Sequence, residues 1–213
     1  MDDPVDSLVE LEGNLRDIER ANRFFGGIAP IARVVRRSGA RSLLDVGCGA
    51  ADVSRALVQR ARRWGRSLHV TCLDRSDQML AIAAERGGGF TFVCGDATAL
   101  PFADGSVDVA MCSLVLHHFS PEAAVRMLRE LRRVSRLTPL VCDLRRSRFA
   151  YVATRAFTLL FSRNRLTRND APVSVLRSYT PAEARELATA AGWRAPQVQI
   201  ERWFRMTLSD DGV

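Results

Sequence analysis

The chain alternates short apolar runs with longer segments in which apolar residues recur at helical spacing. The apolar runs are Ser42–Val46, Leu68–Leu73, Phe90–Cys94, Val107–Cys112 and Leu137–Cys142, and the helical segments between them cover 52–63, 76–86 and 121–136. This alternation is typical of βαβ units, whose buried parallel strands are joined by right-handed helical crossovers. We therefore predict an α/β fold built on a Rossmann-like, doubly wound, mostly parallel sheet.

The run LLDVGCGAAD at residues 43–52 places a glycine turn where the first predicted strand leads into a helix. Glycine lets the backbone approach a ligand closely, and a helix N-terminus offers unpaired amide groups. In a dinucleotide-binding fingerprint the third glycine would fall at Asp52, where a carboxylate would repel a pyrophosphate. That objection does not apply to a zwitterionic ligand that bears a sulfonium.

Asp74 follows the second apolar run. An acid at the carboxyl end of the second strand is placed to accept hydrogen bonds from both ribose hydroxyls, in NAD as well as in S-adenosylmethionine. The alternative is that Asp74 caps the helix predicted at 76–86. The residue therefore indicates a nucleoside and does not identify which one.

Residues 94–119 read CGDATALPFADGSVDVAMCSLVLHHF. Together with the glycine turn and Asp74, this stretch resembles the class I S-adenosylmethionine-dependent methyltransferases, in particular the branch that includes ubiquinone and menaquinone biosynthesis methyltransferases. That family shows a DxGxGxG loop, an acid ending strand two, a GDA–LPF–D–S-FD stretch, and LHH after strand four. The resemblance covers residues 40–145 and departs at Ala51, where the family usually has its third glycine.

The resemblance implies S-adenosyl-L-methionine as the cofactor and assigns residues to each part of it, although each residue taken alone is also compatible with a plain turn. These residues are Asp45 for the methionine amine; Gly47, Cys48 and Gly49 for the carboxypropyl chain; Asp74, Arg75 and Met79 for the ribose and its surroundings; Asp96 and Ala97 for the adenine; and Ser113 and Leu114 near the sulfonium.

His117 and His118 are the candidate catalytic residues, because imidazole titrates near neutrality and can accept a phenol or enol proton. The alternative is that one of them stacks under the cofactor or packs at the start of a helix. Asp143 follows the fifth strand and is assigned to substrate binding or to a helix cap. No metal is predicted, because the position after strand four is Ser113 and one acid cannot form a divalent-metal cluster.

The remaining segments are predicted to complete a single domain, 1–213. Residues 1–38 form an N-terminal helical cap, 39–143 the cofactor-binding core, 144–178 a helical insertion that covers the substrate, and 179–213 a C-terminal helix and strands. The insertion reads as an apolar helix followed by a polar, arginine-rich loop. The candidate substrate residues in these parts are Phe24, Phe25, Asp143, Arg148 and Tyr151, which suit a small, hydrophobic or aromatic acceptor methylated on oxygen or carbon.

The net charge of +7 raises the alternative of an RNA or other nucleic-acid methyltransferase. The arginines are spread along the chain, however, and the Asp/Asn-Pro-Pro-aromatic motif of amino-methylating enzymes is absent after strand four. A NAD(P)-binding oxidoreductase would share the first two motifs but not the third, and a non-catalytic cofactor-binding protein remains a further alternative. We predict a small-molecule acceptor, no nucleic-acid partner and no membrane partner.

The five cysteines are odd in number and include no CxxC pair, which argues against a disulfide framework. Cys72, Cys94, Cys112 and Cys142 lie in the apolar runs and are predicted to be small buried residues. The N-terminus lacks an apolar signal core, and no run approaches a membrane-spanning length. These features predict a cytoplasmic protein.

Overall fold

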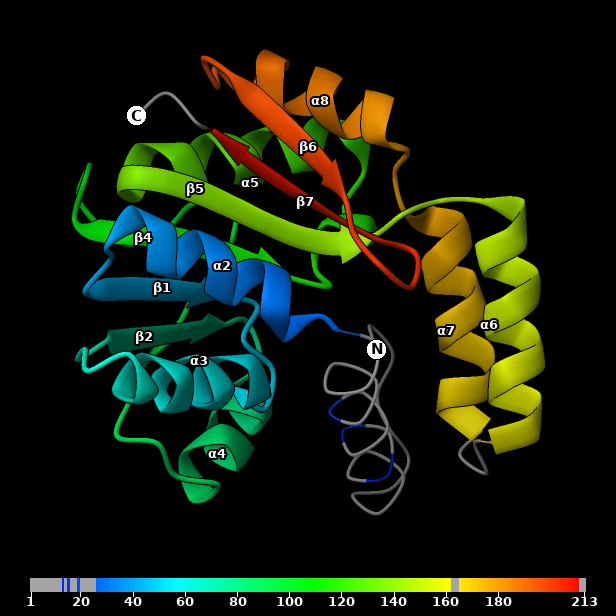
Figure 1. Cartoon of the computed structure of the whole chain (residues 1–213), viewed down its shortest axis with the longest axis horizontal. Coiled ribbons are helices and arrows are strands. Elements are labelled where there is room, and N and C mark those ends of the chain that lie inside the picture. The colour runs from blue at the N-terminus through cyan, green and yellow to red at the C-terminus, as the bar shows by residue number, and fades with distance from the viewer. Residues whose placement is uncertain (1–12, 14, 16–18, 20–25, 162–164, 211–213) are drawn as a thin grey trace.

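The computed structural model describes residues 13, 15, 19, 26–161 and 165–210, and its centre is a single seven-stranded sheet (Figure 1). The strands are β1 (Ser42–Val46), β2 (His69–Asp74), β3 (Thr91–Cys94), β4 (Val107–Ser113), β5 (Ser135–Leu144), β6 (Pro196–Ile200) and β7 (Arg205–Asp210). Their order is β3-β2-β1-β4-β5-β7-β6. The first five strands are parallel, and β7 is antiparallel to both β5 and β6. This confirms the predicted doubly wound, mostly parallel sheet.

Helices cover both faces of the sheet. The helical elements are α2 (Ile28–Ser38), α3 (Asp52–Arg63), α4 (Asp77–Glu85), the 3₁₀ turn η1 (Leu116–His118), α5 (Pro121–Val134), α6 (Arg148–Phe161), α7 (Arg165–Arg177) and α8 (Pro181–Ala190). Of these, α6 and α7 stand beside the sheet (Figure 1). Helices α2 and α3 lie on one face, while α5 and α8 lie on the other (Figure 1). Successive side chains of β1 serve both layers, because Leu43 joins the core under α2 and α3, whereas Leu44 and Val46 join the core under α5 and α8.

Local signals set the helix starts that the sequence predicted. The Ser76 hydroxyl accepts from the Met79 amide at α4, and Ser120 with Pro121 opens α5. At α8, Thr180 and Glu183 form a reciprocal capping box. The bounds of the predicted strands and helices in the core agree with the structure to within two residues at each end.

Two local predictions were wrong. The segment predicted as an arginine-rich loop after the apolar helix contains α7, which packs against α6 and contacts η1, so tertiary packing outweighs its polar composition and an internal proline, Pro172. Cys94 is exposed, because β3 is an edge strand and Cys94 is its last residue. Among the described residues, no helix is long and apolar enough to cross a membrane.

Candidate functional site

The candidate residues meet at one edge of the sheet because their strands are parallel. Asp45 lies near the carboxyl end of β1, Asp74 ends β2, Ser113 ends β4, and Asp143 lies near the end of β5. In open α/β sheets, ligands bind outside this edge, at the point where the strand order reverses. Here the order reverses between β1 and β4.

The turn after β1 is held closely between β2 and the start of η1. The amides of Gly47 and Cys48 both donate to the carbonyl oxygen of Leu73, at 2.7 and 3.0 Å. Gly47 has a φ of +70°, and a Cβ placed on it would lie 2.6 Å from Cγ2 of Val115. A side chain at this position would therefore strain the backbone and push Val115 away from the turn.

Ala51 closes the same turn in a left-handed conformation, with a φ of 57° and a fully buried side chain. Its amide donates to the Cys48 carbonyl at 2.8 Å. This is the position at which the related family usually has glycine. The turn keeps its left-handed backbone with alanine, at a cost of about 1–2 kcal/mol relative to an ordinary conformation.

Asp45 is buried beneath the turn and paired with the first turn of α3. Its Oδ2 accepts from the Ser54 hydroxyl at 2.6 Å. Burial raises the pKa of Asp45 to about 7; the Ser54 hydrogen bond opposes that rise, while the carboxylates of Asp52 and Asp74 add to it. A cation bound above this carboxyl would favour its ionised form.

The Asp74 carboxylate is oriented by two backbone amides. Oδ2 accepts from Gly49 at 2.9 Å and Oδ1 accepts from Ser76 at 3.0 Å. The N-cap of α4 is Ser76, whose hydroxyl accepts from Met79 at 3.3 Å. Asp74 therefore links the glycine turn to the start of α4, and its half-buried carboxylate retains acceptor capacity for further partners.

An apolar cluster lies over the glycine turn. Leu15 is buried against Ala50 and Met79, and Ile82 packs beside them. The Arg86 guanidinium lies 3.8 Å from the carboxylate of Glu19 in the same N-terminal segment. Sequence reasoning had not singled out Leu15, because a leucine in a helical cap carries no sign of what it will cover.

Asp96 lies two residues after the end of β3, in a turn. Its Oδ1 accepts from the amide and the hydroxyl of Thr98, at 2.7 and 2.9 Å. These hydrogen bonds lower the pKa of Asp96 below its ordinary value. The carboxylate is thus exposed, ionised and fixed in direction, next to the half-buried Ala97.

The end of β4 also carries unusual features. Leu114 has a φ of 59°, and its amide donates to the Cys142 carbonyl at 2.9 Å. The Ser113 hydroxyl oxygen is buried and, among the described residues, has no hydrogen-bond partner. Buried polar atoms are nearly always paired, so an unpaired hydroxyl at this edge is an acceptor or donor that a ligand would satisfy after a small rearrangement.

The side chains of His117 and Asp143 are in hydrogen-bond contact. Nδ1 of His117 lies 2.6 Å from Oδ1 of Asp143, and the His117 amide donates to Oδ2 at 3.2 Å. Both side chains are buried, whereas His118 is exposed and stacks on His117 with ring centroids 4.3 Å apart. Although burial raises the pKa of Asp143, the charge and hydrogen bonds of His117, with the Leu144 amide, bring it below its ordinary value.

Helix α7 lies against these histidines, which the sequence did not predict. It contacts η1, and the Tyr179 hydroxyl just beyond it donates to the Phe119 carbonyl at 2.7 Å. The tyrosine before the capped helix is a sequence feature that could have indicated this contact, because a buried tyrosine hydroxyl needs a hydrogen-bond partner.

Other candidates are less enclosed. Arg75 and Arg148 are exposed, and Tyr151 is half-buried with its hydroxyl 3.4 Å from Nη1 of Arg155. Phe24 and Phe25 lie outside the described residues. Within the described part of the chain, no group of three or more His, Cys, Asp or Glu residues gathers where a metal ion would bind.

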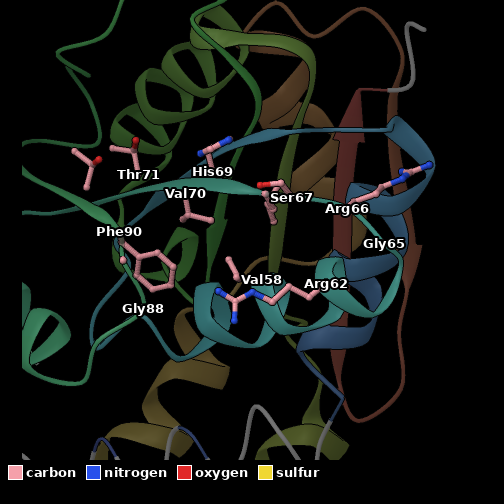
Figure 2. Close-up of a pocket in the computed structure, with 13 residues that line it drawn as sticks. Val58, Arg62, Gly65, Arg66, Ser67, His69, Val70, Thr71, Gly88 and Phe90 are labelled. Atoms are coloured by element: carbon pink, nitrogen blue, oxygen red, sulfur yellow. The ribbon is translucent and has the colours of Figure 1, made fainter.

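A cavity of about 560 Å³ lies at the opposite, amino-terminal edge of β2 and β3. Its lining includes Arg62, Arg66, His69 and Phe90, and Figure 2 shows Arg62 and Arg66 extending in different directions. Because these polar groups do not converge and no candidate residue lines the cavity, we do not assign it to the predicted site.

The sequence is similar to those of known methyltransferases. Residues 43–137 match the family model for a methyltransferase domain. The chain is 36% identical over 104 residues to a demethylmenaquinone methyltransferase of Thermotoga maritima, an alignment covering 49% of this chain and 43% of that protein. It is 30% identical over 175 residues to a malonyl-[acyl-carrier protein] O-methyltransferase of Herminiimonas arsenicoxydans, covering 82% of this chain and 61% of that protein.

Solved structures share the fold. An S-adenosylmethionine-dependent methyltransferase from Aquifex aeolicus superposes with a TM-score of 0.67 at 18% identity, covering 94% of this chain and 96% of that one. Magnesium protoporphyrin IX methyltransferase from Synechocystis with bound S-adenosylhomocysteine gives a TM-score of 0.60 at 17% identity, covering 97% and 88%. The chain spans less than half the length of the first curated relatives it matches, with 43% and 36% covered.

Proposed function

We propose that this protein, whose residues 43–137 match the methyltransferase domain model, is an S-adenosylmethionine-dependent methyltransferase that methylates a small, hydrophobic or aromatic acceptor on oxygen or carbon. The observation that carries the proposal is the buried Asp143–His117 pair, which lies at the same sheet edge as the glycine turn. A proton-accepting group beside the cofactor end of the sheet is what a phenol or enol acceptor requires.

The residues present fit the cofactor. The turn at Gly47 has no room for a side chain. The buried Ser113 hydroxyl, which has no hydrogen-bond partner in the described part of the chain, lies at the adjacent strand end. We assign Asp45 to the methionine amine, Asp74 to the ribose and Asp96 to the adenine amino group. When bound, S-adenosylmethionine supplies an electrophilic methyl group on its sulfonium.

His117 is the candidate base. An ionised Asp143 can only accept hydrogen bonds, so Nδ1 of His117 carries a proton, and in the neutral form of the ring Nε2 is the basic nitrogen. A proton taken from the acceptor by Nε2 would leave an imidazolium that the Asp143 carboxylate stabilises. His118 is exposed beside it and is the residue assigned to contact with the acceptor.

The segment 144–178 is assigned to enclosing the acceptor, together with the N-terminal cap, residues 1–38. Helix α7 contacts η1 directly, so an acceptor near the histidines would lie beside it. Excluding water around the transferred methyl favours displacement by the acceptor over side reactions. Arg148 and Tyr151, at the start of α6, are assigned to a polar group on the acceptor.

The relatives suggest two acceptor chemistries to compare. One resembles a quinone precursor with an ionisable ring hydroxyl and an adjacent ring carbon, as the Thermotoga enzyme's name indicates. The other is an acyl carboxylate on a carrier, as the Herminiimonas enzyme's name indicates, and that alignment extends over more of this chain. The buried base favours the first, because a carboxylate is already ionised at neutral pH and needs no base.

The test combines binding and turnover. Titration calorimetry with S-adenosylmethionine and with NAD is expected to show binding of the first alone. Incubation with labelled S-adenosylmethionine and a panel of phenols, quinols, acyl-thioester carboxylates, transfer RNA and duplex DNA is expected to label phenols or quinols. Labelling of nucleic acid alone, or binding of NAD in place of S-adenosylmethionine, would overturn the proposal.

A further inference from the structure

Helix α6 buries small and polar side chains and exposes large apolar ones. Ala150 and Thr158 are buried and Thr154 is half-buried, at positions i, i+4 and i+8 of one face. The opposite face carries Phe149, Val152 and Leu159, which are 73%, 61% and 52% exposed. A helix that packs only on its neighbour would show the reverse pattern, so the exposed face is built to meet something apolar.

The exposed face lies on the outside of the molecule. Helix α7 contacts both α6 and η1, and it lies between α6 and the sheet (Figure 1). The ring of Phe149 packs edge-on against Phe204 with centroids 5.5 Å apart. Phe204 follows Trp203, which is 52% exposed at the turn between β6 and β7. We define the exposed apolar residues of α6, Phe149, Val152 and Leu159, as the outer apolar patch.

The charge of the chain is concentrated in the same segment. Residues 144–178 contain eight arginines and one acidic residue, which gives +7 and equals the net charge of the whole chain. The remaining residues contain 23 arginines and 23 acidic residues and are neutral. The arginines are dispersed along the chain, as the sequence indicated, but segment 144–178 contains only one acidic residue to balance its own arginines. Arg148 and Arg155 are exposed on α6 and flank the outer apolar patch.

We propose that α6 docks on an anionic phospholipid surface, with the outer apolar patch in the interface and the flanking arginines against the headgroups. A helix with exposed arginines beside an exposed face of large apolar side chains has the composition of interfacial helices. A nucleic acid would leave the apolar side chains in water. A second copy of this chain would bring two faces of the same strong positive charge together.

This proposal departs from the sequence-based expectation of no membrane partner, which rested on the absence of an apolar run long enough to span. It goes beyond the proposed function, because the outer apolar patch itself contains no residue assigned to the cofactor, to proton transfer or to the acceptor. Arg148 beside the patch is assigned to the acceptor, so the charge reversal in the test is made at Arg155. Peripheral docking would bring the enzyme to a surface in which hydrophobic molecules dissolve.

The test is co-sedimentation of the full chain with vesicles of phosphatidylcholine alone or with 30% phosphatidylglycerol. Binding is expected only to the anionic vesicles and should weaken as salt rises. Val152→Gln/Leu159→Gln should reduce binding about tenfold or more, and Arg155→Glu about tenfold. Arg129→Glu, which makes the same change of charge at an exposed position on α5, should leave binding within about twofold of the parent.

Several outcomes would overturn the proposal. One is a folded chain that ignores anionic vesicles, and another is binding that Val152→Gln/Leu159→Gln leaves unchanged. A dimer in solution that these substitutions dissolve would mean that a second copy covers the face. Equal binding of parent and variant to soluble polyglutamate or duplex DNA, competing with vesicles, would assign the charge to an acidic protein or nucleic acid instead. Circular dichroism of each variant verifies that it is folded.

Discussion

Nδ1 of His117 lies 2.6 Å from Oδ1 of Asp143, and both side chains are almost completely buried. The two residues come from different elements, η1 and β5, and meet because β4 and β5 are neighbours in the sheet. A carboxylate in this position orients the imidazole and would stabilise its protonated form. The predictions below begin with this pair.

Asp143→Asn should lower kcat by about tenfold to a hundredfold, and His117→Gln by about a hundredfold or more, if the pair accepts a proton. Both variants should leave the affinity for S-adenosylmethionine within about twofold, because neither residue is assigned to the cofactor. Steady-state kinetics with calorimetry checks this. A parent-like kcat in folded His117→Gln would exclude proton transfer through this ring.

The same pair should affect stability in acid. The pKa of Asp143 is below its ordinary value in the folded protein, so its contribution is present above pH about 4 and is lost as pH falls through the lower folded value. Urea unfolding from pH 7 to pH 3 should therefore show a steeper loss for the parent than for Asp143→Asn. Glu186→Gln, at an exposed position on α8, is the control and should follow the parent.

Asp45 should produce the opposite slope. Its pKa is about 7 in the folded protein against an ordinary value near 3.8, so the folded state holds a proton that the unfolded state releases. Stability contributed by this group is full below pH about 4 and decreases by up to about 1.4 kcal/mol per pH unit until about pH 7. Asp45→Asn should flatten this decline in urea unfolding, and an unchanged slope would show that the carboxyl is ionised throughout.

Gly47→Ala should destabilise the chain by more than about 2 kcal/mol, since the left-handed backbone and the contact with Val115 both add cost. Adding Val115→Ala should restore part of the loss by removing that contact. Gly49→Ala is the matched control: its φ is also positive, but its nearest neighbour would be Cε of Met79 at 3.7 Å. Equal losses for Gly47→Ala and Gly49→Ala in urea unfolding would contradict the close packing of the turn.

Asp74→Asn should weaken S-adenosylmethionine binding by about 1–2 kcal/mol, the loss expected when hydrogen bonds to a charged group disappear. Ser76→Ala removes the α4 cap and should lower stability by about 1 kcal/mol. It should nevertheless leave cofactor affinity within about twofold at temperatures where the chain is folded, because the Asp74 carboxylate accepts from the Ser76 backbone amide, which alanine retains. Calorimetry that found the two variants equally weakened would assign Asp74 a structural role alone.

The sequence by itself determined the sheet and its helices. Burial on both faces of a parallel strand favours a mostly apolar run, and Ser42–Val46 and Val107–Cys112 are such runs between amphipathic helices. The caps at Ser76, Ser120 and Thr180 act within one turn and are therefore readable locally. The placement of Asp45 and Asp74 at one edge follows from the same parallel pattern.

Only the tertiary structure decided which side chains pair. The partners His117 and Asp143 are 26 residues apart, and Gly49 and Asp74 are 25 apart, so neither contact leaves a periodic signal in the chain. It also decided that the segment after α6 becomes α7, because packing against α6 and η1 stabilises a helix that its composition disfavours. The exposure of Phe149, Val152 and Leu159 could likewise not be predicted from the sequence, since an apolar stripe on a helix does not show whether a neighbouring element will cover it.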